Sequence, residues 1–384
     1  MVDAFRCQIC AADKLEEIPD YGLLPRVTSD AKPWPGGGRL SVCHSCGAIQ
    51  KLPDQKWREE AALIYRNYEM YHLSQGSEQL VFADSGTVSP RSQRLVDYVA
   101  AQLKCSGAGS LIDIGCGNGE ALTNFSRALP DWKLYGTELT DRALPSLQRL
   151  KNFAELYTVS PGEIPERFSL VTMIHSLEHM AEPLPTLRDA AQLMAEDGTL
   201  FVEVPDIETS PFDLLVADHL MHFSRASLGQ LADRCGLAPT ALANDMIPKE
   251  ITFLARRGGG QGLGGAASSG VEIAHSTVRW LVDLMSQIRE LSDKSAIGIF
   301  GTSVAGMAVY GAFREHVQFF VDEDSSRIGR TYDGKPVMAP KDVPADVPVI
   351  MALPPNRAKK AAMRLASTGM RAVCPPPLTA EAMN

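Results

Sequence analysis

The order of apolar and polar positions divides the chain into regions of different kinds. From Arg91 onward, short apolar runs alternate with segments of helical periodicity. Strands are expected at 110–114, 133–137, 170–174 and 199–204, and helices near 91–104, from about 119 and near 183–195. Strands that alternate with helices predict an α/β fold with a parallel, doubly wound sheet covered on both faces.

A second alternating series follows a glycine-rich segment at 256–270, which by composition is a flexible joint or a surface loop. Residues 271–294 have helical periodicity, and strands are expected at 296–300, 317–321 and 347–352. This pattern predicts a second, smaller α/β unit of Rossmann-like type over residues 271–384.

The N-terminal residues carry two C-x-x-C pairs, Cys7 with Cys10 and Cys43 with Cys46. Four sulfurs match tetrahedral Zn²⁺ with no open position, which is the pattern of a structural site. We therefore predict a zinc-binding module over residues 1–56, followed by a helical, tyrosine-rich connector over 57–90. Four unrelated buried thiols, or a redox pair, are the alternatives.

Composition narrows the classes of partner. The chain has 384 residues, with 37 Lys and Arg against 46 Asp and Glu, so its formal charge is -9. A negative field disfavours nucleic acid and anionic membrane surfaces as partners. No run of about 20 apolar residues occurs, and the N-terminus lacks the basic and apolar regions of a secretion signal. We expect a soluble, cytoplasmic protein.

A glycine-rich turn follows the first strand of the doubly wound sheet. Gly115, Gly117 and Gly119 lie between that strand and the next helix, where bare backbone N–H groups can approach a ligand. Glu138 ends the following strand, where an acidic side chain can accept both hydroxyls of a ribose. Asp113 inside the motif disfavours a pyrophosphate and suits a cationic or zwitterionic ligand.

Residues 111–119 resemble motif I of class I S-adenosylmethionine-dependent methyltransferases. Residues 135–138, 168–179 and 197–204 are similar to the ribose-binding strand end and to the fourth and fifth strands of that fold. The resemblance implies a methyltransferase core over 91–256 with S-adenosyl-L-methionine as cofactor. It also implies that His179, in the turn after the fourth strand, shapes the cofactor pocket, and that His175 could face the acceptor.

A zinc module, a methyltransferase core and a second α/β domain, in that order, resemble the sugar C-methyltransferases that act on nucleotide-linked deoxysugars. In that family, tyrosines and serines before the core lie near the acceptor. This resemblance assigns Tyr68 and Ser74 to acceptor binding and Tyr71 to the catalytic set. In the second α/β domain, which holds the nucleotide end of the acceptor in the family, it points to Gly301, Ser303 and Asp322.

The same family has an aromatic, acidic and histidine-containing run after the fifth strand, which corresponds here to residues 212–224. On that correspondence His219 is the catalytic base, and Asp218, which replaces a glutamate, could set the tautomer of His219. Val216 stands where the family usually has a tyrosine, which puts the acceptor in doubt. His222 is a second candidate base, since it would share a face with His219 if the segment were helical.

Carbon is methylated only when it is electron-rich, so a carbon beside a ketone must first lose a proton to give an enolate. A histidine near neutral pKa is suited to that step. Two alternatives remain open: an O- or N-methyltransferase acting on a polysaccharide precursor or another natural-product intermediate, and a non-catalytic scaffold that binds S-adenosylmethionine.

Overall fold

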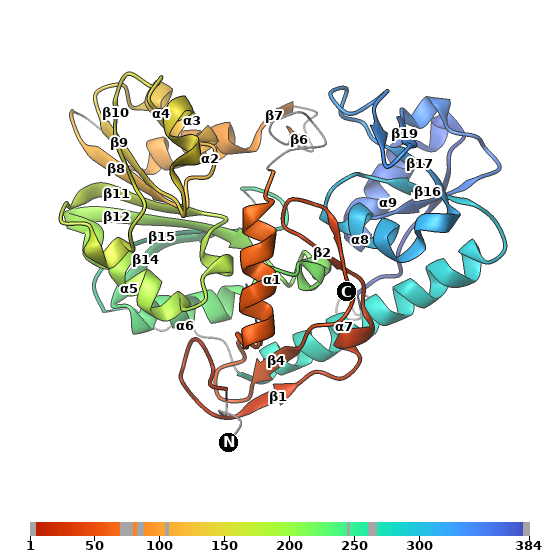
Figure 1. The fold of residues 1–384 in the computed structure, drawn as a ribbon, viewed down its shortest axis with the longest axis horizontal. Coiled ribbons are helices and arrows are strands. Elements are labelled where there is room, and N and C mark those ends of the chain that lie inside the picture. Colours follow the sequence, from red (N-terminus) through yellow and green to blue (C-terminus); the bar gives the residue numbers. More distant parts are fainter. Residues whose placement is uncertain are drawn as a thin grey trace.

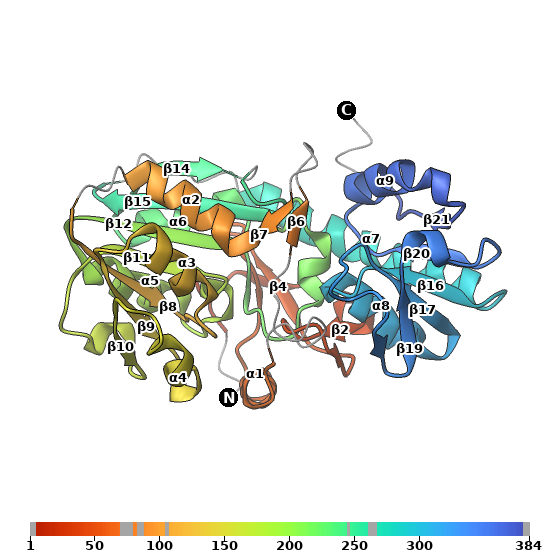
Figure 2. The same ribbon diagram turned by 90° about the horizontal axis from the view of Figure 1, so that it is seen from above.

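The computed structural model describes residues 5–69, 80–82, 88–103, 107–243, 246–259 and 267–378. Two α/β sheets lie at opposite ends of the molecule, and the N-terminal module lies between them (Figures 1 and 2). Tyr71 and Ser74 fall outside the described residues. Within the described part of the chain, none of the helices has both the length and the apolar character that crossing a membrane requires.

The first α/β unit contains a seven-stranded sheet in the order β10-β9-β8-β11-β12-β15-β14. Its strands are β8 (Ser110–Ile114), β9 (Lys133–Thr137), β10 (Phe153–Tyr157), β11 (Phe168–Ile174), β12 (Met194–Pro205), β14 (Leu237–Ala243) and β15 (Glu250–Arg257). In this order, the neighbouring strands from β10 through β9, β8 and β11 to β12 pair in parallel, as predicted. Strand β15 is antiparallel to both β12 and β14. The alternation of strands and helices thus predicted the parallel part, but the chain ends this unit with a hairpin-like return.

Helices cover both faces of this sheet because the strands are apolar on both faces. The helices are α2 (Arg91–Leu103), α3 (Glu120–Ala128), α4 (Leu144–Leu147), α5 (Pro183–Leu193) and α6 (Arg225–Arg234). Alternate residues of β8 show the division: Ile112 belongs to the core on the side of α5 and α6, and Leu111 to the core on the side of α2 and α3. The predicted doubly wound α/β architecture is confirmed.

The second α/β unit contains a six-stranded sheet in the order β18-β19-β17-β16-β20-β21. Its elements are α7 (Ala267–Ser292), β16 (Ile297–Phe300), α8 (Val304–Phe313), β17 (Val317–Val321), β18 (Thr331–Tyr332), β19 (Lys335–Met338), β20 (Pro348–Met351), α9 (Pro355–Arg364) and β21 (Arg371–Val373). Only β18 pairs antiparallel in this sheet. The predicted second α/β sheet is therefore present.

The N-terminal module is built on a four-stranded sheet in the order β1-β4-β5-β13. It comprises β1 (Leu15–Glu17), β2 (Arg26–Val27), β3 (Pro33–Trp34), β4 (Leu40–Cys43), β5 (Ile49–Lys51) and α1 (Gln55–Arg66), while β13 (Met221–His222) comes from the first α/β unit. After α1, a short ribbon pairs β6 (Leu80–Phe82) with β7 (Val88–Pro90). The module therefore takes its edge strand from a segment about 170 residues further along the chain.

The module shares its cores with both α/β units. Cys43 and Cys46 belong to the same apolar cluster as side chains of α6 in the first α/β unit. Tyr21 and Val27 belong instead to a cluster with Trp280 of α7 and other residues of the second unit. Because both neighbours bury apolar surface against it, the module joins the two units, a role that its sequence did not reveal.

Candidate functional site

The glycine turn connects the end of β8 to the start of α3. Gly115, Gly117 and Gly119 have φ values of 75°, 54° and 86°, which lie in the left-handed region that favours glycine. A Cβ at Gly119 would lie 2.3 Å from Leu147 Cδ2, and one at Gly115 would lie 2.7 Å from the Cβ of Ser176. Backbone conformation therefore favours glycine at all three positions, and close packing adds to this at Gly115 and Gly119. The expected bare N–H groups are hydrogen-bonded within the protein: those of Gly115 and Cys116 donate to the backbone oxygen of Thr137, each at 3.0 Å, and that of Gly119 donates to the backbone oxygen of Cys116 at 2.9 Å.

Glu138 follows β9 and meets this turn directly. Its Oε1 accepts a hydrogen bond from the N–H of Gly117 at 2.9 Å, and its Oε2 accepts one from the N–H of Leu139 at 2.8 Å. The two elements come together because β8 and β9 pair in parallel, with Ile114 opposite Thr137. The structure thus brings the predicted carboxylate and the predicted amide-lined turn to one place.

Asp113 lies beneath the turn rather than at its surface. The side chain is buried, and Thr172 on β11 donates a hydrogen bond to its Oδ1 at 2.6 Å. Burial, with a smaller contribution from the charge of Glu138, raises the pKa of Asp113 to about 7, although the hydrogen bond from Thr172 opposes that change. The residue supports the turn from inside the sheet.

His175 follows β11 with a φ of 49°. Its Nδ1 lies 3.0 Å from Glu178 Oε1, and its Nε2 lies 3.1 Å from Glu250 Oε1. Burial and the charge of Arg91 oppose protonation, but Glu250 and Glu178 together raise the pKa of His175. Since Ser176 packs against Gly115, this ion-paired histidine lies beside the glycine turn.

His219 and His222 are held by one buried carboxylate, that of Asp213. The Nδ1 of His219 lies 2.8 Å from Asp213 Oδ1, and the Nδ1 of His222 lies 2.6 Å from Asp213 Oδ2. Burial opposes ionisation of Asp213, but the charges and hydrogen bonds of the two imidazoles hold its pKa well below the ordinary value. Because an ionised carboxylate only accepts hydrogen bonds, each Nδ1 carries the hydrogen and the Nε2 of His219 is left as a base.

Asp218 points away from this pair. Its carboxylate accepts hydrogen bonds from the N–H and the hydroxyl of Ser29, at 2.9 Å and 2.6 Å. It also lies 3.4 Å from Nδ1 of His179. Asp218, the neighbouring aspartate that the sequence suggested as a partner of His219, thus holds His179 instead, because the side chains of these two adjacent residues diverge. Asp213, which the sequence analysis missed, takes that place.

His179 lies next to the candidate base. Its ring meets the ring of His219 edge-on, with 4.5 Å between centroids, and its Nδ1 lies 2.9 Å from the hydroxyl of Tyr65 on α1. Burial lowers the pKa of His179, but the hydrogen bond and charge of Asp218 raise it above the ordinary value. Tyr68 is near the same helix end, with its ring 6.5 Å from that of Tyr65.

The segment that carries Asp213 and His219 is fixed by burial on both sides. It begins with the short 3-10 helix η6 (Pro211–Leu215), in which Phe212 packs edge-on against Trp280 at 5.5 Å. Val216 is buried and bridges to Val27 of the N-terminal module. The segment is not one helix, so the condition under which His219 and His222 would share a helical face is not met. The shared carboxylate brings the two histidines together.

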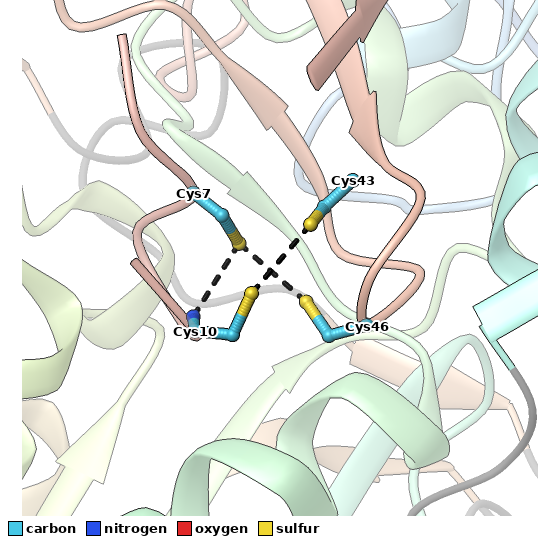
Figure 3. A group of neighbouring side chains, drawn as sticks. All are labelled: Cys7, Cys10, Cys43 and Cys46. Atoms are coloured by element: carbon cyan, nitrogen blue, oxygen red, sulfur yellow. Dashed lines mark hydrogen bonds between the residues drawn. The ribbon is translucent and has the colours of Figure 1, made fainter. Parts of the chain in front are cut away.

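The four cysteines of the N-terminal module converge on one point (Figure 3). The Sγ atoms of Cys7 and Cys46 are 3.5 Å apart, those of Cys10 and Cys43 are 3.6 Å apart, and all four lie within 4.8 Å of one another. Such a closed sulfur set fits a tetrahedral Zn²⁺ ion. Asp213, His219 and His222 also meet that distance, but their Nδ1 hydrogens and the Asp213 oxygens are used for one another.

In the second α/β unit, Gly301 and Ser303 lie between β16 and α8, and Asp322 follows β17. Gly301 has a φ of 90°, and Thr302 donates a hydrogen bond to Asp322 Oδ2 at 3.0 Å. Arg327 closes the group, with Nη1 3.3 Å from the same oxygen. The predicted residues thus share one end of the sheet, and the sequence analysis missed Arg327.

Comparison with known proteins agrees with this geometry. Residues 88–242 match a family described as a methyltransferase domain. The ubiquinone biosynthesis O-methyltransferase of Xanthomonas campestris is 30% identical over 131 residues, which are 32% of this chain and 53% of that protein. The chain spans about half the length of the curated relatives that it matches.

Among solved structures, an S-adenosylmethionine-dependent methyltransferase from Clostridium acetobutylicum is 11% identical, with 53% of this chain and 100% of that chain covered and a TM-score of 0.38. The family match therefore places a methyltransferase domain over residues 88–242, the part of the chain that carries most of the seven-stranded sheet. The predicted enzyme class is confirmed at the level of this domain.

Proposed function

We propose that the protein transfers a methyl group from S-adenosylmethionine to a carbon of a nucleotide-linked keto-deoxysugar, with His219 as the general base. The observation that carries the proposal is the contact of His219 Nδ1 with Asp213 Oδ1 at 2.8 Å. This contact is typical of a base whose tautomer is fixed by a carboxylate. A histidine held in that way is suited to remove a proton from a carbon next to a ketone.

The chain's own residues account for the steps around the transfer. When bound, S-adenosylmethionine supplies an electrophilic methyl group on a sulfonium. The Gly117 amide and the carboxylate of Glu138 would hold it, with Glu138 exchanging its bonds to Gly117 and Leu139 for ribose hydroxyls. His219 takes the acceptor proton on Nε2, and Asp213 stabilises the resulting imidazolium.

The acceptor assignment rests on the resemblance of the three-part order and on the second α/β unit. Gly301, Ser303 and Asp322 gather at one end of the second sheet, where a glycine turn precedes α8. Such a turn at a helix N-terminus suits a phosphate-bearing ligand. In this proposal the second unit holds the nucleotide and the sugar reaches toward His219. The four-cysteine cluster binds Zn²⁺ and has a structural role.

A second candidate is O-methylation, because the curated relatives are named O-methyltransferases. The same His219 would then deprotonate a hydroxyl group. The two candidates differ in the atom that loses its proton.

Two measurements test the proposal. Calorimetry with S-adenosylmethionine tests cofactor binding, and methyl transfer from the bound cofactor separates an enzyme from a scaffold that only binds it. Incubation with nucleotide-linked keto-sugars in deuterium oxide should then exchange the hydrogen next to the ketone in the wild type. His219→Gln should lose this exchange, and His316→Gln, a matched change in the second unit, should keep it. Wild-type protein that methylates a hydroxyl without any carbon exchange would refute carbon methylation.

A further inference from the structure

Lys51 is a buried cation that neither the glycine turn nor the zinc cluster uses. It ends β5 and is 1% exposed. Its Nζ donates hydrogen bonds to the backbone oxygen of Val216, to that of His219 at 3.0 Å, and to Nε2 of His222 at 3.3 Å. All three acceptors belong to the segment that carries the candidate base.

The backbone around Lys51 holds the same segment. Strand β5 pairs antiparallel with β13, with Gln50 opposite Met221 and Ile49 opposite His222. The N–H of Lys51 donates to the backbone oxygen of Leu220 at 2.8 Å. Strand β5 of the N-terminal module therefore holds the segment that carries His219 through backbone hydrogen bonds and through the side chain of Lys51.

We propose that Lys51 is a positioning residue, which orients His222 through its Nε2 and balances the buried charge of Asp213, so that His219 presents an unprotonated Nε2 to the acceptor. This inference rests on the proposed role of His219 as the base. It does not depend on whether the acceptor atom is carbon or oxygen.

The hydrogens can be followed from Lys51 to His219. A charged lysine side chain can donate hydrogen bonds but cannot accept them. Nε2 of His222 must therefore accept the hydrogen bond from Lys51, and the hydrogen of His222 must lie on Nδ1. That hydrogen is donated to Oδ2 of Asp213. Oδ1 is then available for the Nδ1 hydrogen of His219, which leaves Nε2 of His219 without one.

Burial opposes the ammonium form of Lys51, whereas its nearby carboxylates and its three hydrogen-bond acceptors favour that form. Burial lowers the pKa of Lys51 to about 7, while Asp213 and Asp218 oppose that change. Three acceptors match the three N–H groups of an ammonium ion, whereas an amine could serve only two. Burial and the charge of Lys51 lower the pKa of His222 to about 4, so that His222 is neutral.

Charged and titratable groups face this chain of hydrogen bonds from every element that packs around it. On the side of Lys51 they include Arg26 and Glu60, which form an ion pair at 2.7 Å. On the side of His219 they are His179, Glu178 and Asp218. Arg26 and Glu60 largely compensate each other, so removal of Lys51 leaves the Asp213 carboxylate without its buried counter-charge. An imidazole that contacts Asp213, on His219 or His222, should then bind a proton more readily.

The experiment compares Lys51→Met with Lys56→Met. Lys56 lines the same small cavity as Lys51, together with Trp57 and Glu60, and serves as the matched control. Methyl-transfer rates are measured from pH 6 to pH 10 with the full-length protein. We expect Lys51→Met to lower kcat at pH 7 by about tenfold or more, with recovery at higher pH and KM for both substrates within about twofold. Lys56→Met should follow the wild-type profile.

A uniform loss of kcat at every pH in Lys51→Met would mean a merely structural role and would overturn the inference. If that variant does not fold, nitrogen-15 NMR of the histidine rings in wild-type protein decides. We expect His219 and His222 both to carry their hydrogen on Nδ1, and a hydrogen on Nε2 of His222 would refute the arrangement. Full activity of His219→Gln, in contrast, would refute the proposed function itself.

Discussion

Replacement of Asp213 by asparagine changes one buried atom and reverses the direction of a hydrogen bond. The asparagine side chain has the shape of the aspartate but offers one acceptor oxygen and one donor NH₂ group. In the wild type, both carboxylate oxygens accept, at 2.8 Å from His219 and 2.6 Å from His222. Asparagine can accept from only one of the two rings.

The structure decides which ring loses its acceptor. Lys51 donates to Nε2 of His222, so the hydrogen of His222 stays on Nδ1 and is donated to the single side-chain oxygen of the asparagine. The NH₂ group then faces Nδ1 of His219, which must accept, and the hydrogen of His219 moves to Nε2. In this tautomer His219 is no longer a base at the position that faces the acceptor.

The expected loss follows from the weight of general base catalysis. A positioned base contributes roughly 10² to 10⁴ in rate, and the corresponding change in a Ser-His-Asp triad lowers kcat by about 10⁴. We therefore expect Asp213→Asn to lower kcat by about 10² to 10⁴, with S-adenosylmethionine affinity within about twofold. Because the side chains have the same shape, the variant should still fold, with a lower Tm from the loss of the buried carboxylate.

Single-turnover methyl transfer and calorimetry measure these quantities. Asp218→Asn is the matched comparison, since Asp218 is equally buried in the same segment but bonds Ser29 and His179. Its loss of kcat should be at least about tenfold smaller than that of Asp213→Asn. If Asp213→Asn kept wild-type kcat while remaining folded, the assignment of the His219 tautomer would be refuted. In a Lys51→Met background, the asparagine could turn to either ring, so the effect of Asp213→Asn should be smaller there.

The remaining predictions concern the zinc site, the glycine turn and acid stability. Metal analysis should return about one zinc per chain, and Cys43→Ser should be unfolded or insoluble, because structural zinc contributes folding free energy directly; a stable, zinc-free Cys43→Ser protein would contradict this. Gly119→Ala should weaken S-adenosylmethionine binding by about tenfold or more, since its Cβ would meet Leu147 at 2.3 Å, whereas Gly107→Ala, with a φ of 96° but open space, should bind normally. Because the pKa of Asp213 is depressed in the folded protein, the unfolded chain binds a proton at this carboxyl group more readily. The stabilisation of the fold by ionised Asp213 is therefore complete above the ordinary carboxyl pKa of about 3.9 and is lost as the pH falls below that value. Urea unfolding from pH 6 to pH 3 should therefore show a shallower acid loss in Asp213→Asn than in the wild type.

The sequence by itself determined the local features of this protein. Alternating apolar runs predicted both α/β sheets, because strand and helix periodicities are local properties of the chain. Glycine spacing and the acid at position 138 predicted the turn at Gly117 and its partner, since consecutive parallel strands end at the same edge. The two C-x-x-C pairs predicted one cysteine cluster in the same way.

Only the tertiary structure decided how the candidate base is held. Asp213 is six positions before His219, and Lys51 lies 168 positions before it, so no periodicity relates the three residues. Their meeting depends on β13 joining the sheet of the N-terminal module and on Phe212 packing against the second α/β unit. Contacts between segments so far apart arise from burial of apolar surface in the assembled fold, which leaves no local pattern in the sequence.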